Sequence, residues 1–121
     1  MTPLDVQVSD LGRYSLVTLF GEIDASNSNW FREELSIAIA GANEAVIVDL
    51  KSLAFSDSGG LGVFVSAARM ARERRIQFEI AGPRGRVATV FRLLGMDKAL
   101  QVRADVQESV EALSLLGEGQ L

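Results

Sequence analysis

A short stretch of the chain brings together a hydroxyl, a carboxylate and glycines. Residues 55–62 read FSDSGGLG, so Ser58 follows Asp57 and precedes two glycines. The apolar residues that come next have the spacing of one face of a helix: Leu61, Val65, Ala68 and Ala71. We therefore expect Ser58 to be the N-cap of that helix. Its hydroxyl would lie beside free backbone N–H groups at the positive end of the helix dipole.

Hydrolysis by an activated serine is the first chemistry that this hydroxyl suggests, because Asp-Ser-Gly-Gly also surrounds the nucleophile of trypsin-like proteases. That reaction needs a general base beside the hydroxyl, and the chain contains no histidine. A serine-lysine pair with Lys51 or Lys98 is formally open, but neither spacing supports it. We predict that the chain is not an enzyme.

Nucleotide, metal and cofactor sites find little support in the same residues. A phosphate-binding loop of the form G-x-x-x-x-G-K-[ST] is absent, and the residue before Ser58 is an acid rather than a lysine. Asp49 and Asp57 have no histidine or cysteine to complete a metal site. We expect no metal and no cofactor, and we interpret Ser58 as a group on which another protein acts.

Three motifs of the chain resemble those of the STAS domain in bacterial anti-sigma-factor antagonists. FSDSGGLG is similar to that family's aspartate-serine-(serine or threonine)-glycine-leucine-glycine signature. Residues 21–24 (GEID) are similar to its glycine-glutamate-leucine-aspartate motif, and residues 94–98 (LGMDK) to the turn after its third main helix. Gly59 departs from the family pattern, because a second hydroxyl residue usually stands at that position.

The resemblance implies partner switching in transcription regulation, of the kind used in stress response and sporulation. An unmodified family member binds an anti-sigma factor and so frees the sigma factor. The anti-sigma factor is also a serine kinase that phosphorylates the motif serine, here Ser58, and a serine phosphatase removes the phosphate. The partner-binding residues carried over are Asp24, Asp57, Ser58, Gly59, Gly60 and Leu61. The alternative is a STAS scaffold or a transporter-associated STAS subunit, in which Ser58 is only a structural cap.

Strands and helices alternate along the chain, which predicts an α/β fold with parallel strands joined by right-handed crossovers. An initial antiparallel hairpin makes the predicted sheet mixed. The resemblance likewise implies a single STAS domain over residues 1–121, with helices packed mainly on one side of the sheet. The ranges we expect are strands at 2–9, 14–20, 45–48, 76–80 and 100–102, a loop at 51–56, helices at 27–40, from 58, at 83–94 and from 105, and a frayed tail at 117–121. The apolar run at 45–48 is typical of a central strand buried on both faces. Asp105 with Glu108 is a variant of the capping box at the start of the last helix.

The composition is that of one ordinary globular domain. The chain has 121 residues, of which 48% are hydrophobic and 23% charged, and it has no cysteine. No basic segment followed by an apolar run opens the chain, and no apolar stretch approaches the roughly 20 residues that span a bilayer. We therefore expect a cytoplasmic protein with no membrane contact.

The formal net charge of −4 argues against direct nucleic-acid binding, which needs clustered cations. Arginines do cluster near the end of the helix that follows Ser58: Arg69, Arg72, Arg74 and Arg75. We interpret this cluster as a solvated helix end whose cations complement the helix dipole. Trp30 lies beside the apolar stripe of its predicted helix, and we expect it to be partly buried.

Overall fold

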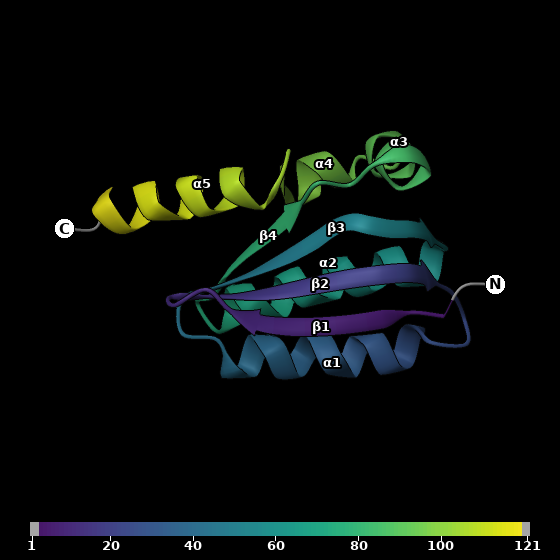
Figure 1. Cartoon of the computed structure of the whole chain (residues 1–121), viewed down its shortest axis with the longest axis horizontal. Helices are drawn as coiled ribbons and strands as arrows, with labels where there is room; N and C mark the ends of the chain where they lie inside the picture. Colours follow the sequence, from purple (N-terminus) through teal and green to yellow (C-terminus); the bar gives the residue numbers. More distant parts are fainter. Residues whose placement is uncertain (1–2, 120–121) are drawn as a thin grey trace.

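The computed structural model describes residues 3–119, which form a mixed sheet and the helices that pack on it (Figure 1). The elements follow one another as β1 (Asp5–Asp10), β2 (Tyr14–Ile23), α1 (Ser28–Gly41), β3 (Ala45–Ser56), α2 (Ser58–Glu73), β4 (Gln77–Ala81), α3 (Gly85–Leu93), α4 (Met96–Ala99), β5 (Gln101–Arg103) and α5 (Val106–Gly119).

The strands lie in the sheet in the same order as in the sequence, β1-β2-β3-β4-β5. β1 pairs with β2 antiparallel, whereas the other neighbours pair parallel. Each parallel pair is joined through at least one helix. The predicted α/β fold with a mixed sheet is therefore confirmed.

β3 is the central strand, and its first half, residues 45–50, is buried on both faces. Val46 and Val48 belong to a large core that α1 and α2 cover, whereas Ala45 and Ile47 belong to a smaller core with Leu113 of α5. Figure 1 shows α5 on the far side of the sheet from α1 and α2. The large core also contains three phenylalanines in edge-to-face contact, with ring centroids 5.4 and 5.9 Å apart: Phe31, Phe64 and Phe91. Helices thus pack mainly on one face, with α5 on the other.

The predicted loop at residues 51–56 is wrong, because β3 continues through this stretch. Pairing of β3 with β4 ends at Asp49, but pairing with β2 continues until Ile23 lies opposite Ser56. A strand paired on one side only can expose much of its surface, so this half of β3 lacks the apolar pattern that marks its first half. β2 is also three residues longer than predicted. Both strands therefore end together at one edge of the sheet.

The predicted apolar face of α2 is right for Leu61 and Ala71 and wrong for Val65. Leu61 and Ala71 are buried, whereas Val65 leaves 41% of its surface exposed. The buried face of the helix includes Val63 and Phe64 in place of Val65. The larger Phe64 ring takes the core position, so Val65 turns toward the solvent.

Two helix ends and one side chain complete the comparison with the sequence. Gly95 adopts the left-handed conformation (φ 68°) that ends the α3 segment, and the short α4 that follows was not predicted. Asp105 caps α5 as expected, accepting a hydrogen bond from the Glu108 backbone N–H at 2.8 Å. α5 extends to Gly119, and the rest of the predicted frayed tail, residues 120–121, lies outside the described residues. Trp30 is 44% exposed.

Candidate functional site

Asp57, and not Ser58, is the N-cap of α2. The Asp57 backbone is extended (φ −79°, ψ 179°), and its carboxylate accepts a hydrogen bond from the Gly60 backbone N–H at 2.9 Å. The prediction of Ser58 as the cap is therefore wrong. Because β3 runs to Ser56, only Asp57 remains between strand and helix, and its carboxylate is the side chain placed to cap.

Ser58 becomes the first residue of α2 and lies on the surface. Within residues 3–119 its hydroxyl has no hydrogen-bond partner, since the cap is supplied by its neighbour. Backbone N–H groups of the first helical turn lie beside it, and the helix dipole favours negative charge there. The result is an exposed, unengaged hydroxyl in the first turn of α2.

The two glycines after Ser58 serve different purposes. A side chain on Gly60 would overlap Ser56 Oγ and Ile23 Cγ2, so glycine is required for the start of α2 to approach the end of β2. A side chain on Gly59 would meet only Asp57 Oδ1, at an ordinary 3.4 Å, and Gly59 is exposed. Packing therefore permits a hydroxyl residue at position 59.

A second acidic residue lies at the same edge of the sheet. Ile23 pairs with Ser56, and the Asp57 backbone N–H donates to the Ile23 carbonyl at 3.1 Å, so Asp24 and Asp57 leave neighbouring strand ends together. The Asp24 carboxylate accepts from the Ser26 hydroxyl and, at 2.8 Å, from the Ser26 backbone N–H. These two bonds, the hydroxyl's first, lower the pKa of Asp24 below its usual value.

Asn27 holds the Asp24 turn in place. Its side-chain oxygen accepts from the Asp24 backbone N–H at 3.0 Å, and its amide nitrogen donates to the Glu22 carbonyl at 2.9 Å. The GEID segment is thus the end of β2 followed by a fixed turn that begins at Asp24. The Asp24 carboxylate lies at the edge of the sheet where α2 begins.

The predicted partner-binding residues divide into a surface group and a supporting group. Asp24 and Asp57 are partly exposed, and Ser58 and Gly59 are exposed. Gly60 is buried and Leu61 is only 4% exposed, so in the free chain these two shape the site from beneath. The structure brings the six residues to one edge of the molecule.

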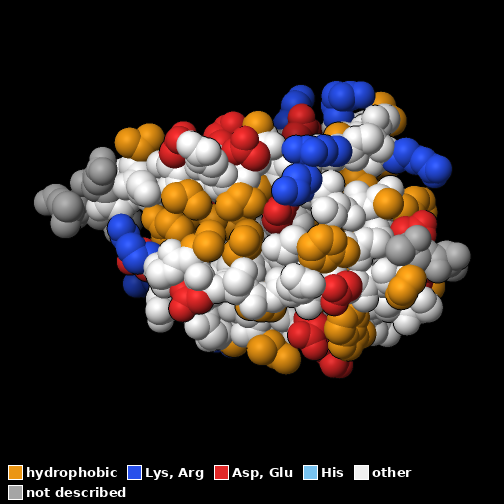
Figure 2. Space-filling view, in the orientation of Figure 1, with side chains coloured by type: hydrophobic (Ala, Val, Ile, Leu, Met, Phe, Trp, Pro, Cys, Tyr) orange, Lys and Arg blue, Asp and Glu red, His pale blue; other side chains and the backbone are white. Residues whose placement is uncertain are grey.

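Sequence reasoning missed a small apolar hollow next to this edge, about 50 Å3 in volume. It is lined by Phe55, Ser56, Leu61, Arg86, Val87 and Val90. The one signal for this hollow in the sequence was the aromatic Phe55 next to the motif. In the structure Phe55 is 36% exposed. The α3 residues are thirty positions away in the sequence, so only the fold brings them here. Figure 2 shows Lys and Arg side chains gathered over the end of the molecule where α3 and α4 lie.

Neither a metal centre nor a membrane span emerges from residues 3–119. No group of three or more histidine, cysteine, aspartate or glutamate side chains in this part of the chain could hold a metal ion. None of the helices described there is long and apolar enough to cross a bilayer.

Known proteins with a similar sequence are named as antagonists and not as enzymes. The anti-sigma-B factor antagonist of Listeria monocytogenes is 29% identical over 83 residues, which are 69% of this chain and 73% of that protein. An anti-sigma factor antagonist from Mycobacterium paratuberculosis has the same fold, with a TM-score of 0.84 at 21% identity over 93% of this chain and 95% of that one.

A third similar protein has been solved in two states. The anti-sigma factor antagonist SpoIIAA in its unphosphorylated form gives a TM-score of 0.76 at 25% identity, covering 91% of this chain and 96% of that one. SpoIIAA of Bacillus in its phosphorylated form gives 0.68 at 24% identity, covering 90% and 99%. The sequence model of the STAS domain family matches residues 5–109 of this chain. This range includes the whole sheet and the site at its edge. This chain belongs to the STAS domain family.

Proposed function

We propose that the chain is an anti-sigma-factor antagonist that binds its anti-sigma factor when Ser58 carries no phosphate. The anti-sigma factor is then also the serine kinase that modifies Ser58, and a serine phosphatase reverses the modification. The observation that carries the proposal is the unengaged, exposed Ser58 hydroxyl beside Asp57, which takes over the capping role. The names of the similar proteins, one of them solved with and without phosphate, support the same role.

The proposed partner surface is the edge at which β2 and β3 end. Asp24, Asp57, Ser58 and Gly59 form its exposed part, and Gly60 and Leu61 support it from beneath. The exposed Phe55 at the neighbouring hollow adds an apolar contact of the kind that anchors interfaces. We place this exchange in the cytoplasm, where sigma factors meet RNA polymerase.

Phosphorylation is expected to switch binding without unfolding the domain. A phosphate adds about −1.5 to −2 charge, which the first turn of α2 tolerates because of its free N–H groups and dipole. In a complex the same charge has to be desolvated beside Asp57 and Asp24. Burying an uncompensated charge in an interface costs roughly 2 to 5 kcal/mol of binding free energy. The modified chain is therefore released.

The direct experiment mixes the purified chain with a histidine-kinase-like anti-sigma factor from the same genome, with ADP or with ATP. We expect a stable complex with ADP, and with ATP a phosphate on Ser58 followed by release. Ser58→Ala should bind in both nucleotides and remain bound with ATP. Ser66, on the same helix, is exposed and serves as the control: Ser66→Ala should behave as the unmodified chain. A phosphate mapped to Ser56 or Ser66, with Ser58 unmodified, would contradict the assignment.

A further inference from the structure

The end of α3 places two neighbouring leucines on the surface of the molecule. Leu93 is 75% exposed and Leu94 is 62% exposed. The buried contacts of α3 are made by other residues of the helix, Val87 and Phe91. Large apolar side chains that gather on a free surface often mark an interaction site.

Backbone hydrogen bonds hold these leucines in a defined turn between α3 and α4. The Leu94 N–H donates to the Val90 carbonyl at 3.0 Å, and the Gly95 N–H donates to the carbonyl one turn before the leucines end, at 3.2 Å. Gly95 is left-handed (φ 68°), and Met96 after it is buried. The backbone therefore turns into the core directly after the leucines and leaves their side chains outside. A partner would not have to pay the entropy of ordering this turn.

The first arginines of α3 lie at the end of the helix where they stabilise it least. Arg84 is the N-cap residue and makes no capping hydrogen bond, Arg86 lies in the first turn, and that turn has no acidic residue. The positive end of a helix dipole disfavours cations. Neither arginine forms an ion pair within residues 3–119. The folding of α3 therefore does not account for these two cations.

The segment that contains α3 and α4 differs in charge from the whole chain. Residues 84–98 include four cations and one acid, Asp97, which gives a net charge of +3, whereas the whole chain has −4. The four cations are Arg84, Arg86, Arg92 and Lys98. Figure 2 shows Lys and Arg side chains over this end of the molecule. This end should therefore attract acidic groups.

One face of α3 joins the exposed leucines to the proposed partner surface. Arg86, Val90 and Leu93 follow one another at spacings of four and three residues, so they lie on the same side of the helix. We call these three residues and Leu94 the α3 strip. Arg86 and Val90 also line the small apolar hollow that Phe55 borders from the other side. The α3 strip is thus continuous with the edge at which β2 and β3 end.

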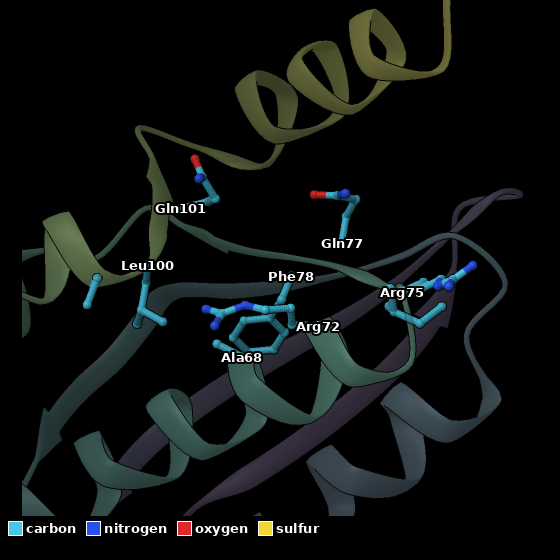
Figure 3. Close-up of a pocket in the computed structure, with 9 residues that line it drawn as sticks. Ala68, Arg72, Arg75, Gln77, Phe78, Leu100 and Gln101 are labelled. Carbon is cyan, nitrogen blue, oxygen red and sulfur yellow. The ribbon is translucent and has the colours of Figure 1, made fainter. Parts of the chain in front are cut away.

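The arginines at the end of α2 differ from those of the α3 strip. They are exposed, as expected for a solvated helix end. Figure 3 shows the hollow of about 480 Å3 at this place, where Arg72 and Arg75 extend in different directions. Phe78 and Leu100 beneath them are each only 7% exposed. This end of α2 therefore has cations without an accessible apolar surface, and it can serve as a control.

We propose that the α3 strip is a further contact for the anti-sigma factor, which meets it with leucine-sized apolar side chains flanked by carboxylates. The proposal rests on the proposed function, because it names the chemistry of the same partner. Leu93 and Leu94 would be buried against the apolar side chains, and Arg86 would pair with a carboxylate. Nucleic acid and anionic membranes fit less well, because Asp24 and Asp57 at the adjoining edge repel them. A protein can present both signs of charge to one surface.

Exposed leucines on two helices allow a matched test of the apolar contact. Binding of the full chain to the ADP-bound anti-sigma factor is measured by titration calorimetry. Leu93→Ser should weaken binding about tenfold or more. Leu115→Ser alters a leucine of α5 that is 68% exposed on the other face of the sheet, and it should change the affinity less than about twofold. Both variants should melt within a few degrees of the unmodified chain, because both leucines are exposed.

Two arginines test the contribution of charge in the same way. Arg86→Gln should weaken binding about fivefold or more at low salt and make the affinity less dependent on salt. Arg72→Gln removes the same charge at the far end of α2 and should change the affinity less than about twofold. Equal losses from Arg86→Gln and Arg72→Gln would show general attraction by cations and would contradict the assigned contact.

The outcomes separate this proposal from the proposed function. If the unmodified chain forms no complex with the anti-sigma factor, the proposed function fails and the α3 strip loses its partner. If the complex forms and is released on phosphorylation of Ser58, but Leu93→Ser and Arg86→Gln bind as tightly as the unmodified chain, only the α3 proposal is wrong. Binding to phosphatidylserine vesicles that Leu93→Ser abolishes, with unchanged affinity for the anti-sigma factor, would assign the strip to a membrane instead.

Discussion

Asp57 and Ser58 are adjacent, but replacing Asp57 with alanine should lower the free energy of unfolding much more than replacing Ser58. Asp57→Ala removes the carboxylate that caps the Gly60 N–H at 2.9 Å, and loss of an N-cap costs about 1 kcal/mol within a range of about 0.5 to 2. Ser58→Ala removes an exposed hydroxyl with no partner in residues 3–119, so its effect should stay within about 0.5 kcal/mol.

Urea unfolding followed by circular dichroism measures both changes, provided that the dependence on urea concentration stays the same. For a domain of this size, about 1 kcal/mol corresponds to a fall of roughly 3 to 6 °C in melting temperature. Asp57→Asn is the matched control, because asparagine caps helices as well as aspartate does and should recover most of the loss. If Ser58→Ala destabilises as much as Asp57→Ala, then Ser58 has a structural role and the division of labour between the two residues is wrong.

Three further predictions concern the supports of the site and the sheet. Gly60→Ala forces a side chain into two core atoms and should cost about 1 to 3 kcal/mol in urea unfolding; an unchanged midpoint would contradict the close approach. Arg103→Ala leaves Glu79, which is 1% exposed, without its 2.8 Å ion pair and should cost about 3 kcal/mol at neutral pH, so a loss under about 1 kcal/mol would refute this account. Ser26→Ala should raise the pKa of Asp24 toward its usual value, as seen by carboxyl chemical shifts. The pKa of Asp24 is lower in the folded chain than in the unfolded chain, so the ionised Asp24 stabilises the fold above its unfolded pKa. This stabilisation is lost as the pH falls through the folded pKa. Ser26→Ala makes the stabilisation smaller, so this variant should lose less stability in acid than the unmodified chain.

Much of the fold could be predicted because each element carries its own local signal. The alternation of strands and helices, the buried first half of β3 and the Asp105 cap all follow from short patterns, and the structure confirms them. The second half of β3 could not be predicted in this way. It is held by pairing with β2 on one side, and its solvent-facing residues carry no apolar period.

The candidate site shows the same division between local signals and tertiary contacts. Asp57 and Ser58 are both good capping residues, and only the length of β3 decides that Asp57 takes the cap. The requirement for glycine at Gly60 comes from Ile23 and Ser56, of which Ile23 lies on another strand.

The most direct test of the account is the affinity of the anti-sigma factor, with ADP bound, for the chain with and without phosphate on Ser58. If the phosphate acts by blocking the edge formed by Asp24, Asp57 and Ser58, affinity should fall about a hundredfold or more, equivalent to roughly 2.7 kcal/mol. The melting temperatures of the two forms should meanwhile agree within a few degrees, since the first turn of α2 tolerates the charge. Equal affinities, or a large fall in melting temperature together with shift changes across the whole sheet, would contradict it.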